Sequence, residues 1–212
     1  MKNTIVKIIV LSFCLFSLIG CTTKKGNSPG LELTSLYDDK SNSFVLDGYA
    51  PATDWQELSK DLNINLDMVK QDENRYYIDN IVEIYPKSNG FISLGKVIID
   101  DESANVIYSF YQEKLYAVNY HFELSKEENE QRINIATNLN SDLDAIFTGF
   151  ISNYENKIGG FDTAYYKWFT GSQGTMSCLT LSTSTDSDTG ELQIDLSVTC
   201  DIPGNEFATT IY

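Results

Sequence analysis

Between Arg75 and Phe122 the sequence alternates apolar and polar residues in four consecutive runs, and this period of two limits the fold more than any other feature. The alternating runs cover residues 76–85, 90–99, 105–111 and 114–122. Turn-forming residues separate them at 86–90, 100–104 and 112–114. Because turns this short return each strand beside the one before it, the segment predicts an antiparallel meander.

A short helix is expected before the meander. Residues Thr53 to Gln56 form a capping box, in which a hydroxyl caps the helix and a glutamine follows three residues later. Trp55, Leu58 and Leu62 then recur at the spacing of one helix face.

A longer helix is expected after the meander, beginning at a second capping box, Ser125 to Glu128. Apolar residues then follow at steps of three and four: Leu139, Leu143, Ile146, Phe147, Phe150, Ile151, Tyr154 and Ile158. Gly159 and Gly160 are expected to end this helix. In one interpretation the polar segment 138–141 divides it into two pieces.

Further strand-like runs at 164–170, 175–184 and 191–200 complete an order of helix, strands, helix, strands. This order predicts an α+β fold: one or more antiparallel β-sheets with one long and one short helix packed on one face. Two tandem helix-plus-meander units are the alternative arrangement, although no sequence repeat links the halves. We expect residues 31–212 to form a single globular domain, with a subdivision near residue 124 as the alternative.

The amino terminus has the form of an export signal. A basic leader, residues 1–7, precedes an apolar run at 8–19. This run is shorter than the roughly 20 residues of a membrane-spanning helix, and it matches the core of a signal peptide. The run ends in Leu18-Ile19-Gly20-Cys21, where a small residue precedes a cysteine.

The tetrapeptide at 18–21 resembles the lipobox of bacterial lipoproteins. The resemblance implies diacylglyceryl transfer to the Cys21 thiol, cleavage before Cys21, and acylation of the new amino terminus, so residues 1–20 would be a signal peptide. Several acyl chains anchor a protein stably. The polar segment 21–30 then predicts a flexible tether. The alternative is an ordinary secretory signal with an accidental cysteine.

The resemblance also predicts the location of the protein in the cell envelope. Thr22 follows the cysteine, where an aspartate would retain a Gram-negative lipoprotein in the inner membrane. The expected location is therefore the outer membrane of a Gram-negative host, or the outer face of the plasma membrane in any other host.

The net charge of the mature chain limits the classes of macromolecule that it is expected to bind. Removal of the leader takes away Lys2 and Lys7 but no acid, which leaves 13 basic and 30 acidic residues and a net charge of −17. Such a chain repels the phosphates of nucleic acid, so no nucleic-acid partner is expected. The charge would instead steer a basic protein toward this one.

Two cysteines, Cys178 and Cys200, remain after cleavage and lipidation, in a compartment that permits disulfides. They lie at the outer ends of an expected hairpin whose turn is 186–190. We therefore predict a structural disulfide between them, with two free thiols as the alternative. Placing Cys178 directly opposite Cys200 conflicts with the hydrophobic pattern, because this register puts the apolar residues of the two strands on opposite faces of the sheet. A one-residue bulge, or cover on both faces, would resolve the conflict.

Motifs for catalysis, metal or cofactor binding are not found in the sequence. The single histidine, His121, shares a strand face with Asn119 and Ala117, and the opposite face carries the more apolar residues Tyr116, Val118, Tyr120 and Phe122. It is interpreted as a partly exposed strand residue, with a general base as the alternative. The turn 186–191 faintly resembles a calcium loop but lacks ligands that such a loop requires.

Aromatic residues are the remaining candidates for a binding site. Exposed Tyr and Trp side chains often anchor partners. The residues considered for this role are Trp55, Tyr165, Tyr166 and Trp168. Burial of the same sheet on both faces is the alternative.

The expected function is that of a membrane-anchored, non-catalytic lipoprotein that binds another envelope protein as an adaptor, inhibitor or immunity-type module. A glycan-binding or small-ligand-binding lipoprotein is the alternative. A hydrolase using paired carboxylates is a further alternative, because 30 acids always allow some plausible pair.

Overall fold

The computed structural model describes residues 30–122, 129–158, 161–172, 174–185 and 192–210. Its helical segments are η1 (Leu33–Leu36), α2 (Trp55–Asp61), η2 (Leu66–Met68), α3 (Asn129–Ile146) and α4 (Phe207–Thr210). No helix in these ranges combines the length and apolarity needed to cross a membrane.

The strands fall into two antiparallel meanders, with a short hairpin before them. The hairpin consists of β1 (Tyr37–Asp38) and β2 (Ser43–Phe44). The first meander consists of β3 (Lys70–Gln71), β4 (Tyr76–Ile78), β5 (Val82–Ile84), β6 (Asn89–Ile99), β7 (Glu102–Tyr111) and β8 (Lys114–Phe122). The second consists of β9 (Ile151–Ile158), β10 (Phe161–Thr170), β11 (Ser177–Thr185) and β12 (Leu192–Cys200).

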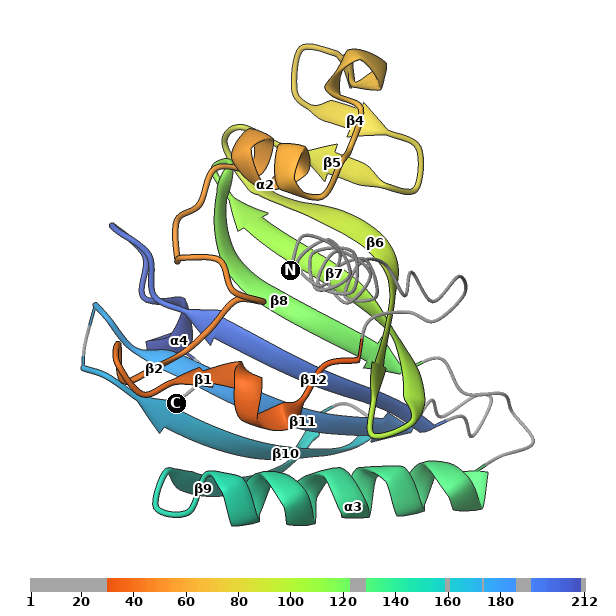
Figure 1. The fold of residues 1–212 in the computed structure, drawn as a ribbon, viewed down its shortest axis with the longest axis vertical. Coiled ribbons are helices and arrows are strands. Elements are labelled where there is room, and N and C mark those ends of the chain that lie inside the picture. The colour runs from red at the N-terminus through yellow and green to blue at the C-terminus, as the bar shows by residue number, and fades with distance from the viewer. Residues whose placement is uncertain (1–29, 123–128, 159–160, 173, 186–191, 211–212) are drawn as a thin grey trace, which may run out of the picture.

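The two meanders join into one continuous sheet, in the order β3-β4-β5-β6-β7-β8-β12-β11-β10-β9 (Figure 1). The junction lies between β8 and β12, which pair antiparallel with Val118 opposite Val198. The α+β fold predicted from the sequence is confirmed. The run predicted as one strand at 76–85 is two strands, β4 and β5, with Asn80 in a left-handed conformation between them.

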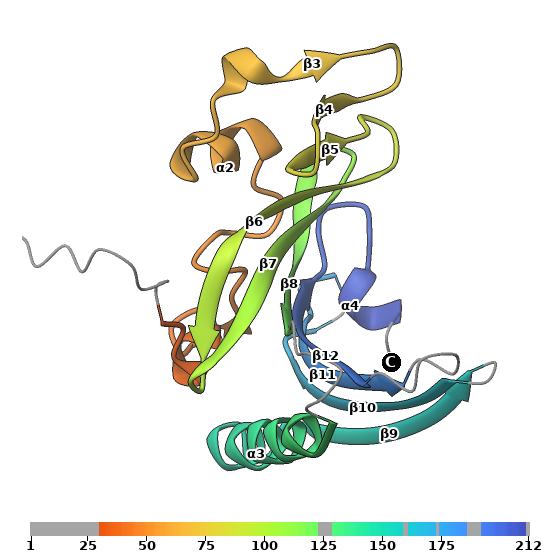
Figure 2. The same ribbon diagram turned by 90° about the vertical axis from the view of Figure 1, so that its right-hand side faces the viewer.

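The sheet bends, and its two faces are covered unequally (Figure 2). On the inner side of the bend lies α4, and on the outer side lie α3 and η1. We call the outer side the covered face; it carries Tyr120, Leu196 and Leu181, which pair in turn. We call the inner side the open face; it carries His121, Asp195 and Ser182, which also pair in turn.

The core lies between the covered face, α3 and the segment before the first meander. The buried apolar residues of α3 are Ile135, Leu139 and Leu143, and the buried Phe147 follows directly after the helix. The ring of Phe147 packs edge-on against Phe44 of β2, with 5.1 Å between their centroids. The backbone N–H of Phe44 donates to the hydroxyl of Ser177 in β11 at 2.8 Å. The hairpin β1–β2 therefore connects α3 to the second meander.

The cap of α2 lies one residue later than predicted. Asp54, not Thr53, is the N-cap, and its carboxylate accepts from the backbone N–H of Gln56 at 2.9 Å. The hydroxyl of Thr53 donates instead to the carbonyl of Ala50 at 2.7 Å. Aspartate caps a helix as well as threonine does, so the helix itself begins where the sequence predicts.

The helix predicted through Ile158 is wrong in its second half. The helix α3 ends at Ile146, and Gly149 turns the chain with a φ of +101°. Residues 151–158 then form β9 and pair along β10. Pairing with a neighbouring strand overrides the local apolar spacing, because periodicity is only a weak prior against tertiary contacts. The second capping box, 125–128, lies outside the described residues.

The predicted disulfide is also wrong, because both cysteines are free and buried. Cys178 pairs with Thr199 rather than with Cys200. This one-residue shift places Leu179 opposite Val198, so the apolar residues of both strands share the covered face. In this register the two cysteines lie on opposite faces of the sheet. The conflict evident in the sequence is thus resolved by register rather than by a bulge.

Both thiols should therefore be unbridged and slow to react. Burial raises the pKa of Cys178 to about 11 and that of Cys200 to about 12. Because the thiolate is the reactive form, alkylation at pH 8 should be much slower in the folded protein than in denaturant. Mass spectrometry of the alkylated protein, denatured without reductant, should find both residues modified. Recovery of a Cys178–Cys200 linked peptide would contradict this prediction.

Candidate functional site

The open face carries mainly short polar side chains. One row of residues, paired in turn across β6, β7, β8, β12, β11 and β10, comprises Ser93, Ile107, Asn119, Ser197, Thr180 and Lys167. Antiparallel sheets often leave one face to solvent. Short side chains allow a bound molecule to approach the strands of this face closely.

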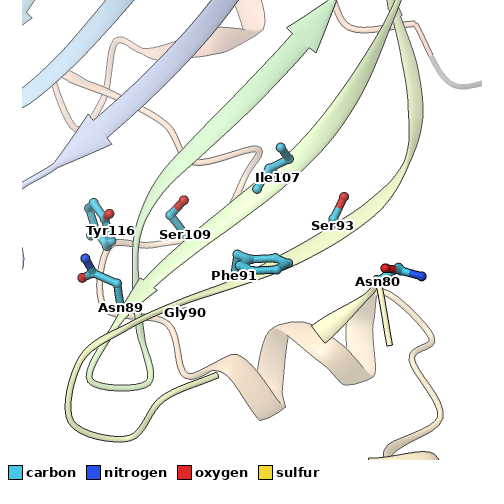
Figure 3. A pocket seen from close by; sticks show the side chains of 8 residues that line it. All are labelled: Asn80, Asn89, Gly90, Phe91, Ser93, Ile107, Ser109 and Tyr116. Carbon is cyan, nitrogen blue, oxygen red and sulfur yellow. The ribbon is translucent and has the colours of Figure 1, made fainter. Parts of the chain in front are cut away.

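A hollow of about 560 Å³ lies on the open face over β6, β7 and β8 (Figure 3). Its polar lining consists of two amides and three hydroxyls, from Asn80, Asn89, Ser93, Ser109 and Tyr116. Its apolar lining comes from Gly90, Phe91 and Ile107. Pockets for small ligands occupy about 300–1,000 Å³, so the hollow is large enough to hold one.

Phe91 is the exposed aromatic residue of the hollow. It alternates along β6 with Ile92, which is fully buried in the core, whereas 37% of Phe91 is exposed. Its neighbours in register are Ser109 on β7 and Glu83 on β5. A large apolar ring therefore stands uncovered on a polar surface, which is more informative than an isolated exposed aliphatic residue.

Tyr116 reaches the hollow through a β-bulge. The register between β7 and β8 shifts at Ser109 and Phe110, and the extra residue on β8 is Tyr116. Strict alternation predicted Tyr116 on the covered face with Val118, and this prediction is wrong. The ring stacks instead on Phe207 of α4, with 4.1 Å between centroids. Burial raises the pKa of the Tyr116 phenol, so its hydroxyl remains protonated at neutral pH.

A network of four polar side chains adjoins the hollow on β8 and β12. Asp195 lies at its centre, 2.9 Å from Nδ1 of His121, and accepts from the Asn119 amide at 3.0 Å. The hydroxyl of Ser197 donates to Oδ1 of Asn119 at 3.0 Å. The side chains of His121 and Asp195 are 34% and 24% exposed. Because Asn119 pairs with Ile107, the network continues from the hollow along the open face.

This network differs from a nucleophilic triad in one bond. In a triad the serine hydroxyl donates to the histidine, which then removes its proton. Here the Ser197 hydroxyl donates to an amide oxygen, which cannot act as a base. The geometry suits a preorganised polar surface better than it suits acyl transfer.

The carboxylate beside the hollow is held as an anion. Glu83, which pairs with Phe91, accepts from the Tyr85 hydroxyl at 2.8 Å and from the guanidinium of Arg75. These hydrogen bonds, from Tyr85 first and then Arg75, lower the pKa of Glu83. A general acid for glycoside hydrolysis needs a raised pKa, so Glu83 is poorly suited to that role.

The pKa of Asp47 is raised, whereas that of Glu83 is lowered, and Asp47 lies on the covered side of the sheet. Its carboxylate accepts from the hydroxyl of Tyr108 at 2.6 Å, and Tyr108 belongs to the core on the covered face. Burial, partly offset by the hydrogen bond from Tyr108, raises the pKa of Asp47. Asp47 and Glu83 therefore cannot act together on one substrate.

The four aromatic residues proposed from the sequence do not form one site. Trp55 is 2% exposed and stacks on Tyr76, and Trp168 is completely buried. Tyr165 lies on the open face, with the ammonium of Lys167 5.3 Å from its ring centroid. Tyr166 lies on the covered face. None of the four lines the hollow, and the two tryptophans serve the core.

The residues of the hollow are not among the candidates that the sequence offered. Its strongest available signal was Phe91, an aromatic residue on the polar side of an otherwise well-patterned strand. Asn80 and Tyr116 offered no signal, because a tight turn and a bulge bring them there. In the described part of the chain, no group of three or more His, Cys, Asp or Glu side chains is arranged to hold a metal ion.

The lipobox, the tether up to residue 29 and the turn 186–191 lie outside the described residues. Comparison with known proteins adds no relative: no family model, no curated protein and no solved structure matches this chain. The function must therefore be argued from the sequence and from the open face.

Proposed function

We propose that this protein is a lipid-anchored lipoprotein of the bacterial cell envelope that binds a small ligand on its open face without transforming it. The anchor would be Cys21, in the outer membrane of a Gram-negative host or on the outer face of the plasma membrane otherwise. The tether 21–30 would hold the folded domain away from the lipid.

The observation that carries the proposal is the difference between the two sheet faces. The helix α3, the segment η1 and the hairpin β1–β2 bury the covered face. The open face keeps a hollow of about 560 Å³, in which five polar side chains surround the apolar surface of Phe91 and Ile107. A cavity with a few convergent polar groups is the default candidate for a ligand site.

Two features favour binding over catalysis. The Ser197 hydroxyl is bonded to Asn119 rather than positioned against His121. The carboxylate of Glu83, which pairs with Phe91 of the hollow, has a lowered pKa and accepts hydrogen bonds from Tyr85 and Arg75. Neither group is prepared to transfer a proton to or from a bound molecule.

A basic envelope protein is the second candidate partner, and the charge of the mature chain favours it. With 13 basic and 30 acidic residues after cleavage, the chain would attract a basic surface from a distance. The hollow nevertheless favours a small ligand over a protein partner. A protein interface of standard size extends over a broad surface, whereas the hollow is one confined cavity.

Ser109→Arg should abolish ligand binding, because the long cationic side chain would occupy the hollow. The test would use the mature protein, purified with its anchor, and the small-molecule fraction of the host envelope. A ligand at 100 times its Kd stabilises the fold by about 2.7 kcal/mol. For a domain of this size the melting temperature should then rise by roughly 5–10 °C.

The matched control is Asn138→Arg, which adds the same charge on the exposed surface of α3, the helix on the opposite side of the sheet from the open face (Figure 2). It should keep the full thermal shift of the unmodified protein. Equal shifts in both variants would place the binding site elsewhere. Steady conversion of the bound ligand into a product would show an enzyme instead.

A further inference from the structure

We infer that the hollow is a binding site for a neutral saccharide, a pyranose mono- or disaccharide. This inference rests on the proposed function, because it names the ligand class of the same open face. It depends on three properties of the hollow: unused hydrogen-bonding groups, an exposed aromatic ring, and the lack of charge among the described lining residues.

The polar groups of the hollow are available to a ligand. Within the described part of the chain, the side chains of Asn80, Asn89, Ser93 and Ser109 make no hydrogen bond to other protein groups. Each amide offers two donor hydrogens and an acceptor oxygen, and each hydroxyl can donate or accept. Sugar hydroxyls have the same dual character, so these side chains match a ring carrying several of them.

The ring of Phe91 supplies the apolar part of the site. Figure 3 places Phe91 near the middle of the lining, with Asn89 and Tyr116 to one side and Asn80 to the other. One face of a pyranose presents C–H groups, which carry partial positive charge and are attracted to the negative face of an aromatic ring. A sugar stacked on Phe91 would thus direct its hydroxyl rim toward the surrounding amides and hydroxyls.

Charge excludes the other common classes of small ligand. None of the eight described lining residues is charged. A phosphate or carboxylate ligand would find no cation there, and the net charge of −17 on the mature chain would repel it. A cationic ligand would find no carboxylate in the lining, since Glu83 is occupied by Arg75. A neutral, hydroxyl-rich molecule meets none of these penalties.

Acyl chains fit the hollow poorly. Most of its lining side chains are polar, and a lipid tail covering Asn80, Asn89 and the serines would remove them from water without giving them hydrogen bonds. Leaving polar groups desolvated and unpaired costs about 1–3 kcal/mol each in proteins. A purely apolar occupant would gain contact with Phe91 and Ile107 but would leave these polar groups unpaired, whereas an occupant with its own hydroxyls satisfies both.

The test measures saccharide binding to the mature protein, purified with its anchor in a detergent that has no sugar headgroup. The probes are glucose, galactose, N-acetylglucosamine and their β-1,4-linked disaccharides, followed by calorimetry and by saturation-transfer NMR. At least one probe should bind with a Kd of about 1 mM or lower. The 6-phosphate of the best monosaccharide should bind more weakly than the neutral sugar.

Substitutions separate the contributions to binding. Phe91→Ala should raise the Kd of the best-binding saccharide about tenfold, because an aromatic contact contributes roughly that factor to affinity. Asn89→Ala should raise the same Kd by a similar factor, because the sugar would lose a pair of hydrogen bonds to the amide. The matched control is Met68→Ala, which truncates another large exposed residue, 62% exposed and outside the hollow, and should leave the Kd unchanged.

The outcomes distinguish this inference from the proposed function. If no saccharide binds but a charged or apolar molecule from the envelope does, and Ser109→Arg abolishes that binding, the saccharide inference is overturned and the ligand-binding function stands. If no small molecule binds the open face, both are overturned. Saccharide binding that survives Phe91→Ala and Asn89→Ala would also overturn the inference, because it would place the sugar elsewhere.

Discussion

Replacing Cys21 with serine should move the protein from the membrane fraction to the soluble envelope fraction. The lipobox resemblance makes the Cys21 thiol the acceptor of the diacylglyceryl group, and a serine hydroxyl is a much weaker nucleophile. Each buried acyl CH₂ contributes about 0.8 kcal/mol to membrane affinity, so loss of several chains removes nearly all of the binding. Fractionation followed by intact-mass spectrometry measures both the location and the missing lipid.

Cys14→Ser is the matched control for this change. Cys14 lies in the apolar run of the leader and would be removed with it. This variant should retain the lipid, the cleavage site and the membrane location. If Cys21→Ser remained membrane-bound, or if the natural protein carried no added lipid mass, the leader would be an ordinary secretory signal.

Gly90→Ala should lower the stability of the fold, although it adds only one methyl group. A Cβ at this position would lie 2.6 Å from the carbonyl oxygen of Glu83 and 2.8 Å from Cα of Ile84. Both are backbone atoms of β5, so the strand itself must move. Overpacking of this kind costs about 1–3 kcal/mol or more, which should lower the melting temperature by several degrees or more.

Gly30→Ala provides the comparison. A Cβ there would meet only the carbonyl oxygen of Ile98, at an ordinary contact distance of 3.9 Å. Its free energy of unfolding, measured by urea denaturation, should change by less than about 0.5 kcal/mol. Equal stability of the two variants would show that β5 can move away from β6 without cost. Saccharide binding by Gly90→Ala should fall as well, because Gly90 lines the hollow beside Phe91.

Strand positions were the most predictable part of the fold. The runs at 90–99 and 114–122 match β6 and β8 to within one residue. Both strands combine strong alternation with flanking turn residues, and a half-buried sheet face requires that alternation. The α+β class follows from the same runs together with the helical spacing before and after them.

Register and helix length were less predictable, because neighbours in space decide them. The cysteine hairpin could pair in two ways that differ by one residue, and burial of Leu179 and Val198 on one face selected the register that separates Cys178 from Cys200. The helix α3 ended early because residues 151–158 found a partner in β10. Neither the register of this hairpin nor the end of α3 can be recognised from the local sequence alone.

By itself the sequence determined the alternation that makes this chain a β-rich domain, the leader and lipobox that predict its location, and the acidic charge from which we expect no nucleic-acid partner. Each of these depends on neighbouring residues or on composition. Only the tertiary structure decided where the hollow of the proposed binding site lies. The hollow assembles a turn residue, Asn80, a bulged residue, Tyr116, and an exposed ring, Phe91, from separate strands. Such a surface arises from the pairing and bending of the sheet, so no local pattern encodes it.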